Sequence, residues 1–249
     1  MTINVYWSRA NPSFSDLEGL GFPKSAYMSP LRIDEPVPLT KHLNYKEFFG
    51  PSVAKCPAIV DDIKNTFVIK SPIDITIDIS RNALQVTNQD LEFAKSFLGE
   101  PQGKFGIHQL SLSYNFFAEK SLLLTQLPAY YDSNSYIDNT HTISASFDIG
   151  RWYRPAGKPA FILKKDAKQL VIKHGDPLLY VRFNTQEKVR LIEFDDTEFR
   201  NLKERSPDWI CTTFKRQSNS VTPLAKCYEL FEMYKMRQRM LKLIKDNLV

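Results

Sequence analysis

The most regular alternation of hydrophobic and polar residues runs from Ile73 to Ile79, where isoleucine takes every second position. Asp74, Thr76 and Asp78 fill the positions between them. Successive side chains of a β-strand point to opposite faces, so this pattern predicts a strand with one buried face and one face in water. Half-buried strands of this kind are typical of antiparallel sheets. The chain is therefore expected to fold as a mainly antiparallel β-structure.

Further short apolar segments before and after this one are also predicted to be strands. Turn residues such as Pro128, Asn134, Gly150 and Gly175 separate them, and their spacing is typical of a β-sandwich or an irregular barrel. The predicted strands are Ile3–Trp7, Phe67–Lys70, Ala83–Val86, Ile107–Phe117, Leu122–Thr125, Thr142–Ile149, Ala160–Leu163, Leu170–Ile172, Leu178–Phe183 and Lys188–Phe194.

The predicted strands define a domain over residues 56–195, which we expect to be an antiparallel β-sandwich with a jelly-roll-like or β-clip-like core. Prolines recur through residues 1–55 and exclude long helices there. The same segment holds many large apolar side chains, among them Tyr45, Phe48 and Phe49, which are not expected to be left in water. It is therefore predicted to be an extended, proline-rich arm packed on the core.

Residues 196–249 are predicted to form a C-terminal helical segment. Its longest helix begins with Thr222 as the N-cap and Pro223 in the first turn, and it ends near Leu248. The helix has an apolar stripe that must be buried, either on the β-domain or against a second copy of the chain. Shorter helices are expected at Asp90–Leu98 and Thr197–Glu204. The residues of the stripe are Leu224, Tyr228, Phe231, Met240 or Leu241, and Ile244.

The excess of positive over negative charge lies in this C-terminal segment. From residue 197 to residue 249 there are eleven Lys and Arg against six Asp and Glu, whereas the preceding residues carry 22 of each sign. The excess indicates weak binding of an anion or a nucleic acid through the last helix. Cations near a helix C-terminus also stabilise the helix dipole, so we favour a solvated structural face for these residues.

The sequence lacks the motifs of several common active sites. It has no GxSxG, no phosphate-binding P-loop and no CxxC pair, and nine glycines are few for a Gly-rich nucleotide-binding fold. Its four histidines show none of the close spacings of metal ligands, so neither a metal nor another cofactor is expected. No apolar run of ~18 residues and no basic-then-apolar leader occurs, which predicts a cytoplasmic protein without a membrane partner.

A few polar residues remain as candidates for a ligand site. Arg151, Tyr153 and Arg154 stand in an unusual tetrapeptide with Trp152, which predicts either a cationic aromatic surface or an edge strand with arginines at its rim. His141 and His174 have two interpretations: convergence across a sheet, where Asp148 or Asp176 would join them, or ordinary loop or surface histidines. We favour the second interpretation. The adjacent pair Asp61–Asp62 is expected in a loop and forms no joint site without a third group.

Three stretches resemble a family of uncharacterised β-rich proteins of ~250 residues from bacteria and from tailed, often marine, phages. They are Lys64–Asp74, Leu122–Pro128 and Ile172–Leu178, and the resemblance extends over residues 56–195. It implies a β-rich fold and a phage-encoded origin, but the family brings no known activity and no catalytic residue. The segment from His174 to Phe183 also resembles the closing strand of β-clip nucleotide hydrolases. The phosphate loop of those enzymes is missing here, because residues 125–128 contain neither Arg nor Gly.

These observations lead to three hypotheses on function. The first is a non-enzymatic binding or structural module that meets a second copy, a virion protein or a host protein. The second is an enzyme or small-molecule binder, cupin-like or β-clip-like, with a pocket at one mouth of the sandwich. The third is nucleic-acid binding through the basic C-terminal helix. The lack of metal, nucleophile and phosphate-loop motifs favours the first, in the host cytoplasm or in a virion.

Overall fold

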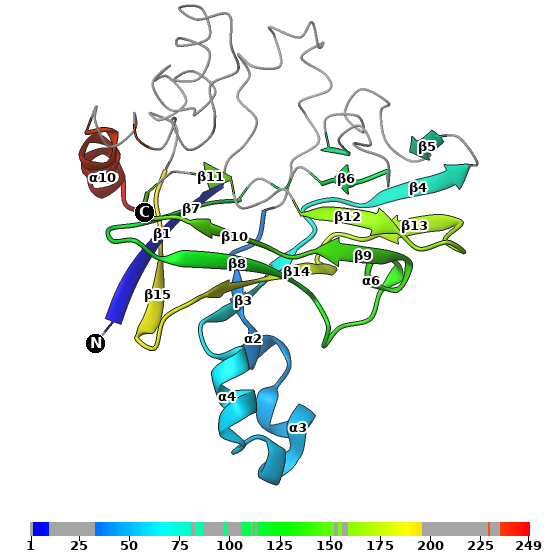
Figure 1. The fold of residues 1–249 in the computed structure, drawn as a ribbon, viewed down its shortest axis with the longest axis horizontal. Helices are drawn as coiled ribbons and strands as arrows, with labels where there is room; N and C mark the ends of the chain where they lie inside the picture. Colours follow the sequence, from blue (N-terminus) through cyan, green and yellow to red (C-terminus); the bar gives the residue numbers. More distant parts are fainter. Residues whose placement is uncertain are drawn as a thin grey trace, which may run out of the picture.

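A computed structural model confirms the mainly β, antiparallel fold that the sequence predicts (Figure 1). It describes residues 2–9, 33–80, 83–86, 97–98, 106–110, 112, 114–151, 154–155, 159–195, 229 and 235–249. The expected helices at Asp90–Leu98 and Thr197–Glu204 lie almost wholly outside these residues, as does the first half of the C-terminal helix. The described strands form four sheets.

The first sheet is built around the N-terminal strand. Strand β1 (Thr2–Arg9) pairs antiparallel with β7 (Tyr114–Ala118) and parallel with β15 (Lys188–Glu193). The short β11 (Arg154–Pro155) completes the order β11-β7-β1-β15. The predicted arm over residues 1–55 thus begins with a central strand of the sheet, and Val5 and Trp7 of this strand are buried in the core.

The second sheet has five strands in the order β10-β8-β14-β3-β2. All its pairs are antiparallel. Strands β8, β14 and β3 are adjacent in this sheet. The strands are β2 (Val37–Pro38), β3 (Thr66–Lys70), β8 (Leu123–Pro128), β10 (Ala145–Asp148) and β14 (Pro177–Phe183).

Two three-stranded antiparallel sheets complete the β-structure, with the orders β6-β12-β9 and β13-β4-β5. The alternation at residues 73–79 behaves as predicted, since Ile73, Ile75 and Ile77 are buried while Asp74 is exposed. The strands are β4 (Ile75–Ser80), β5 (Ala83–Val86), β6 (His108–Gln109), β9 (Thr140–Ile143), β12 (Ala160–Leu163) and β13 (Gln169–Ile172). The five-residue helix α6 (Ser135–Asn139) precedes β9 and is capped by Asn134.

Two predicted strands are each divided between sheets. The segment expected as one strand over 107–117 forms β6 and β7, and the segment over 142–149 forms β9 and β10. In the second case the chain crosses between sheets at Ser144. The inward and outward alternation continues through such a crossing, because the inner faces of both sheets contact the same core. Periodicity alone therefore could not show the division.

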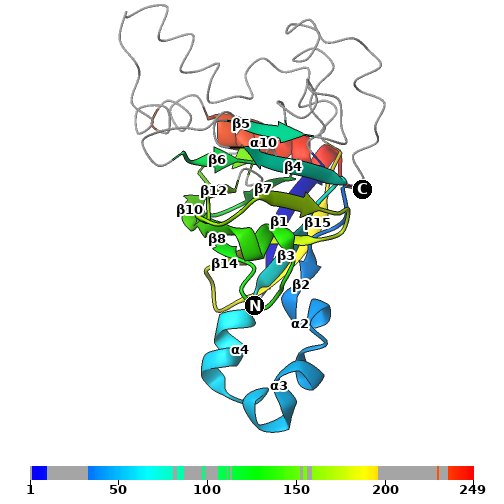
Figure 2. The same ribbon diagram turned by 90° about the vertical axis from the view of Figure 1, so that its right-hand side faces the viewer.

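A helical projection extends from one end of the β-structure, on the side opposite to α10 (Figures 1 and 2). It consists of residues 39–63, which form α2 (Leu39–His42), α3 (Tyr45–Val53) and α4 (Pro57–Ile63). The prolines keep these helices short, and α3 is kinked at Gly50, just before Pro51. Leu39 and Ile63 fasten the projection to the sheet, because they are buried in a small cluster with Val68, Ala129 and Tyr180.

The described part of the C-terminal helix, α10 (Met236–Asp246), packs on the chain's own β-structure. Met240 and Ile244 are buried there, and the Lys245 ammonium lies 3.0 Å from a carboxylate oxygen of Glu119. Leu248 then forms a β-bridge with Phe194. Of the two sequence-based alternatives for this stripe, packing on the β-domain is therefore the one observed for residues 236–246. None of the described helices is both long and apolar enough to cross a membrane.

Candidate functional site

Asp148 organises a turn within its own strand pair. Its Oδ2 accepts a hydrogen bond from the Ser121 hydroxyl at 2.6 Å, and its Oδ1 accepts from the backbone N–H groups of Leu122 at 3.1 Å and Gly150 at 3.0 Å. Three donors thus converge on one carboxylate at the start of β8 and the end of β10. This arrangement gives Asp148 a structural role in closing the β8–β10 pair.

The histidines of the predicted mouth site lie elsewhere in the fold. His174 precedes β14, where its backbone N–H donates to Asp74 at 2.8 Å and its Nε2 lies 3.8 Å from a carboxylate oxygen of Asp34. That turn is near the end of β8, whereas Asp148 lies at its start, so about 17 Å of strand separates the two places. His141 is exposed on β9, in another sheet.

The basic tetrapeptide is described only in part. Arg151 is exposed directly after the turn at Gly150, and Arg154 lies in β11, where its backbone pairs with that of Phe116. Tyr153 lies outside the described residues. Among the described strands, β11 lies at the edge of its sheet next to β7, whereas Trp152, which the edge-strand alternative places in the core, lies outside the described residues.

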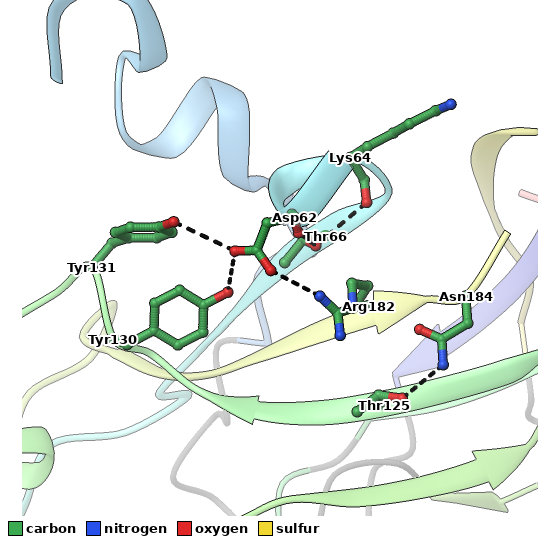
Figure 3. Close-up of polar contacts among 8 residues, drawn as sticks. All are labelled: Asp62, Lys64, Thr66, Thr125, Tyr130, Tyr131, Arg182 and Asn184. Atoms are coloured by element: carbon green, nitrogen blue, oxygen red, sulfur yellow. Dashed lines mark hydrogen bonds and ion pairs between the residues drawn. The ribbon is translucent and has the colours of Figure 1, made fainter. Parts of the chain in front are cut away.

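A different set of residues converges where the projection meets the five-stranded sheet (Figure 3). Asp62 on α4 accepts hydrogen bonds through Oδ2 from the hydroxyls of Tyr130 at 2.8 Å and Tyr131 at 3.4 Å. Its Oδ1 accepts from Arg182 Nη1, on β14, at 2.9 Å. The carboxylate therefore joins the projection, the turn after β8 and β14 at a single point.

A second carboxylate repeats this arrangement nearby. Asp132 accepts a hydrogen bond from the buried hydroxyl of Tyr180 at 2.6 Å, and its other oxygen lies 2.8 Å from Nε2 of His42. His42 belongs to α2 and Tyr180 to β14, so this contact also links the projection to the sheet. The two aspartates hold the helices in place against the β-structure.

Aromatic rings fill the space between the two carboxylates. Tyr130 contacts Tyr131 with ring centroids 4.6 Å apart and Tyr180 with centroids 5.3 Å apart. Tyr131 continues the cluster to Phe49 at 5.3 Å and to Phe48 at 5.9 Å. These edge-to-face contacts are the favourable geometry for aromatic pairs. We define the four rings of Phe48, Phe49, Tyr130 and Tyr131 as the aromatic surface.

Much of the aromatic surface is open to solvent. Phe48 is 50% exposed and Tyr130 44% exposed, and Val53 and Val60 on the same projection are also exposed. The expectation that the large apolar residues of the N-terminal segment are all covered is therefore wrong for Phe48. The reason is geometric, because α3 has no fully buried side chain: Tyr45 and Phe49 are half-buried, while Phe48 lies on its exposed side.

The phenols of this cluster remain protonated well above neutral pH. Burial, and then the hydrogen bond to Asp62, raises the pKa of Tyr130, and burial followed by the bond to Asp132 raises the pKa of Tyr180. A tyrosine that acts as a nucleophile or a general base needs a lowered pKa instead, so that its reactive anion is present near neutral pH. The arrangement is thus suited to donating hydrogen bonds and to packing against a ligand rather than to proton abstraction.

Sequence reasoning missed most of this cluster. Asp62 was recognised only as part of an acidic pair that lacked a third group, and the structure supplies Tyr130, Tyr131 and Arg182 as that group. The one local indication was the run Tyr130-Tyr131-Asp132, in which aromatic and acidic residues adjoin. The three partners of Asp62 are separated from it by 68 residues or more along the chain.

Among the residues that the structure describes, no group of three or more His, Cys, Asp or Glu side chains lies close enough to hold a metal ion. Comparisons with protein-family models, with curated proteins and with solved structures found no match to this chain. The geometry of the projection and its aromatic surface is therefore the basis on which a function can be inferred.

Proposed function

We propose that the protein is a β-sandwich binding module that contacts a protein partner through the aromatic surface of its helical projection. The observation that carries this proposal is the exposure of Phe48 and Tyr130 on a well-anchored support. Large exposed apolar patches on globular domains mark interaction sites, and Tyr, Phe and Arg are enriched at protein interfaces. The resemblance of three stretches to phage proteins adds a phage-encoded origin to the proposal, with a virion or cytoplasmic location.

The anchoring supports binding rather than simple exposure. Asp62 and Asp132 fix the turn at Tyr130 and Tyr131 from two sides, so the rings are held in position before a partner arrives. A preorganised surface loses less conformational entropy when it binds, which increases its affinity. Rigid aromatic anchors of this kind carry most of the binding energy in protein interfaces.

Photo-cross-linking tests the proposal directly. A benzoylphenylalanine would replace Phe48 in one variant and Leu123 in a control variant, because Leu123 on β8 is 47% exposed in the same chain. The proposal predicts a light-dependent covalent adduct with a protein for position 48 and none for position 123. No adduct at position 48, or an equal adduct at both positions, would contradict it.

A further inference from the structure

We infer that the outer face of the five-stranded sheet, at the foot of the projection, is a binding site for an uncharged saccharide. The site consists of Thr125, Ser146, Arg182 and Asn184, which we define as the polar patch, together with the ring of Tyr130. It goes beyond the proposed function, because its polar side chains belong to the sheet and take no part in the aromatic surface.

The pairing of the strands brings the polar patch together on one face. Thr125 on β8 lies opposite Ser146 on β10 and opposite Arg182 on β14. The two hydroxyls are 2.9 Å apart, and Nδ2 of Asn184 donates to the Thr125 hydroxyl at 3.0 Å. Arg182 and Asn184 directly precede and follow Phe183, which belongs to the core, so their side chains leave the sheet on its outer side.

The polar patch keeps hydrogen-bonding groups that its own contacts do not use. Among the described residues, the Arg182 guanidinium donates only to Asp62, and its side chain is 31% exposed, which leaves further N–H donors for a ligand. Asn184 and Ser146 are exposed as well. The amide oxygen of Asn184 is an acceptor, and a hydroxyl both donates and accepts. Donors and acceptors therefore lie next to each other over the patch.

An aromatic ring stands at one end of the polar patch. Tyr130 packs against Tyr180 with ring centroids 5.3 Å apart, and Tyr180 comes two residues before Arg182 on β14. Figure 3 shows the resulting order, from Tyr130 past Asp62 and Arg182 to Asn184. A sugar ring has an apolar face of C–H groups and a rim of hydroxyls, so it can pack its face on Tyr130 while its hydroxyls bond to the patch.

The charge of the polar patch excludes other classes of ligand. Arg182 is its one charged member, and the Asp62 carboxylate at 2.9 Å balances that charge. A phosphate or another strong anion is held by several unbalanced cations, which the patch does not have. A peptide that extends a sheet binds along an edge strand, whereas Thr125 and Arg182 lie on the inner strands β8 and β14. A neutral ligand with many hydroxyls is the class that fits.

A glycan array tests this inference. The biotinylated full chain, displayed on streptavidin, is applied to an array of neutral, sulfated and sialylated glycans. We expect binding to a group of neutral glycans, with no gain from sulfate or sialic acid. Asn184→Ala is expected to weaken this binding at least about tenfold, because sugar hydroxyls lose a partner. The matched control is Asn4→Ala, an exposed asparagine on β1 in another sheet, with an expected change of less than about twofold.

The thermal midpoint of Asn184→Ala shows whether its fold is kept. Should that variant fail to fold, the isosteric Asn184→Asp replaces it and is expected to weaken binding as well. The inference is overturned if no neutral glycan binds, if only acidic glycans bind, or if the Asn184 variant binds as the wild type does. The cross-link from position 48 reports on the proposed function separately, so that the failure of either can be recognised alone.

Discussion

The Asp62 carboxylate on α4 accepts a hydrogen bond from the Arg182 guanidinium on β14 at 2.9 Å, across 120 residues of sequence. The same carboxylate receives the hydroxyls of Tyr130 and Tyr131. One side chain thus connects the projection to the sheet and positions the rings that we propose as a binding surface. The stability of the projection and its ability to bind should therefore depend on the same residue.

Replacing Asp62 by Ala is expected to lower the free energy of unfolding by about 1–2 kcal/mol, because three donors lose their acceptor at a partly exposed site. The neighbouring Asp61→Ala is the matched control, since Asp61 is exposed on the same helix. Its effect should stay within about 0.5 kcal/mol. Urea denaturation of both variants measures the difference, and equal effects would show that the Asp62 contacts contribute nothing to stability.

The stability of the protein should fall at alkaline pH. Burial, followed by the hydrogen bond to Glu119, raises the pKa of Tyr6 to about 12 from its usual 10. The unfolded chain therefore loses this proton first, so the stabilisation is complete below pH 10 and declines as the pH rises toward 12. Unfolding measured from pH 9 to pH 11.5 should show a shallower decline for Tyr6→Phe than for the wild type. An identical pH dependence of the two proteins would contradict this.

Ile244 should be essential to the attachment of α10. Its side chain is 0% exposed, so Ile244→Ala is expected to cost about 2–4 kcal/mol through lost packing and a cavity. Leu248, which is 46% exposed four residues later, serves as the control, with a loss below about 1 kcal/mol for Leu248→Ala. Thermal unfolding of both variants would decide the matter, and a neutral Ile244→Ala would mean that α10 is not part of the core.

Asp148 should behave as a structural residue. Asp148→Ala leaves one hydroxyl and two backbone N–H groups without their acceptor, which is expected to cost about 1–3 kcal/mol. His141→Ala changes an exposed side chain of β9 and should cost less than about 0.5 kcal/mol. Chemical denaturation compares the two. A stable Asp148→Ala protein would reopen the ligand-binding hypothesis for this residue.

The strands were predictable from the sequence because each has one face in a common core. Local patterns in the sequence correspond to strands in the fold: the alternation of Ile73, Ile75 and Ile77, and the apolar runs that form β12 and β14. Their pairing was not predictable in the same way. Strand β1 lies between β7 and β15, more than one hundred residues away, and no local pattern encodes those partners.

The candidate site could not be predicted from the sequence for a related reason. Its parts come from α4, from the turn after β8 and from β14, and they meet only when the sheet has formed. The helices of the projection were also missed. Recurring prolines predicted extended chain over residues 1–55, which include α2 and α3, and α4 lies at the start of the predicted β-domain. The exposure of Phe48 could not be foreseen, because hydrophobicity indicates burial but does not say whether the covering surface belongs to the same chain.

Hydroxyl-radical footprinting of Phe48 tests the central claim most directly, because it measures whether the aromatic surface is covered when a protein partner binds. Leu123 is the internal reference, with nearly the same exposure in the free chain. We predict that the oxidation rate of Phe48 is lower in the complex with the protein that cross-links to position 48 than in the free chain, while that of Leu123 is unchanged. Equal oxidation rates of Phe48 in the complex and in the free chain would contradict the account.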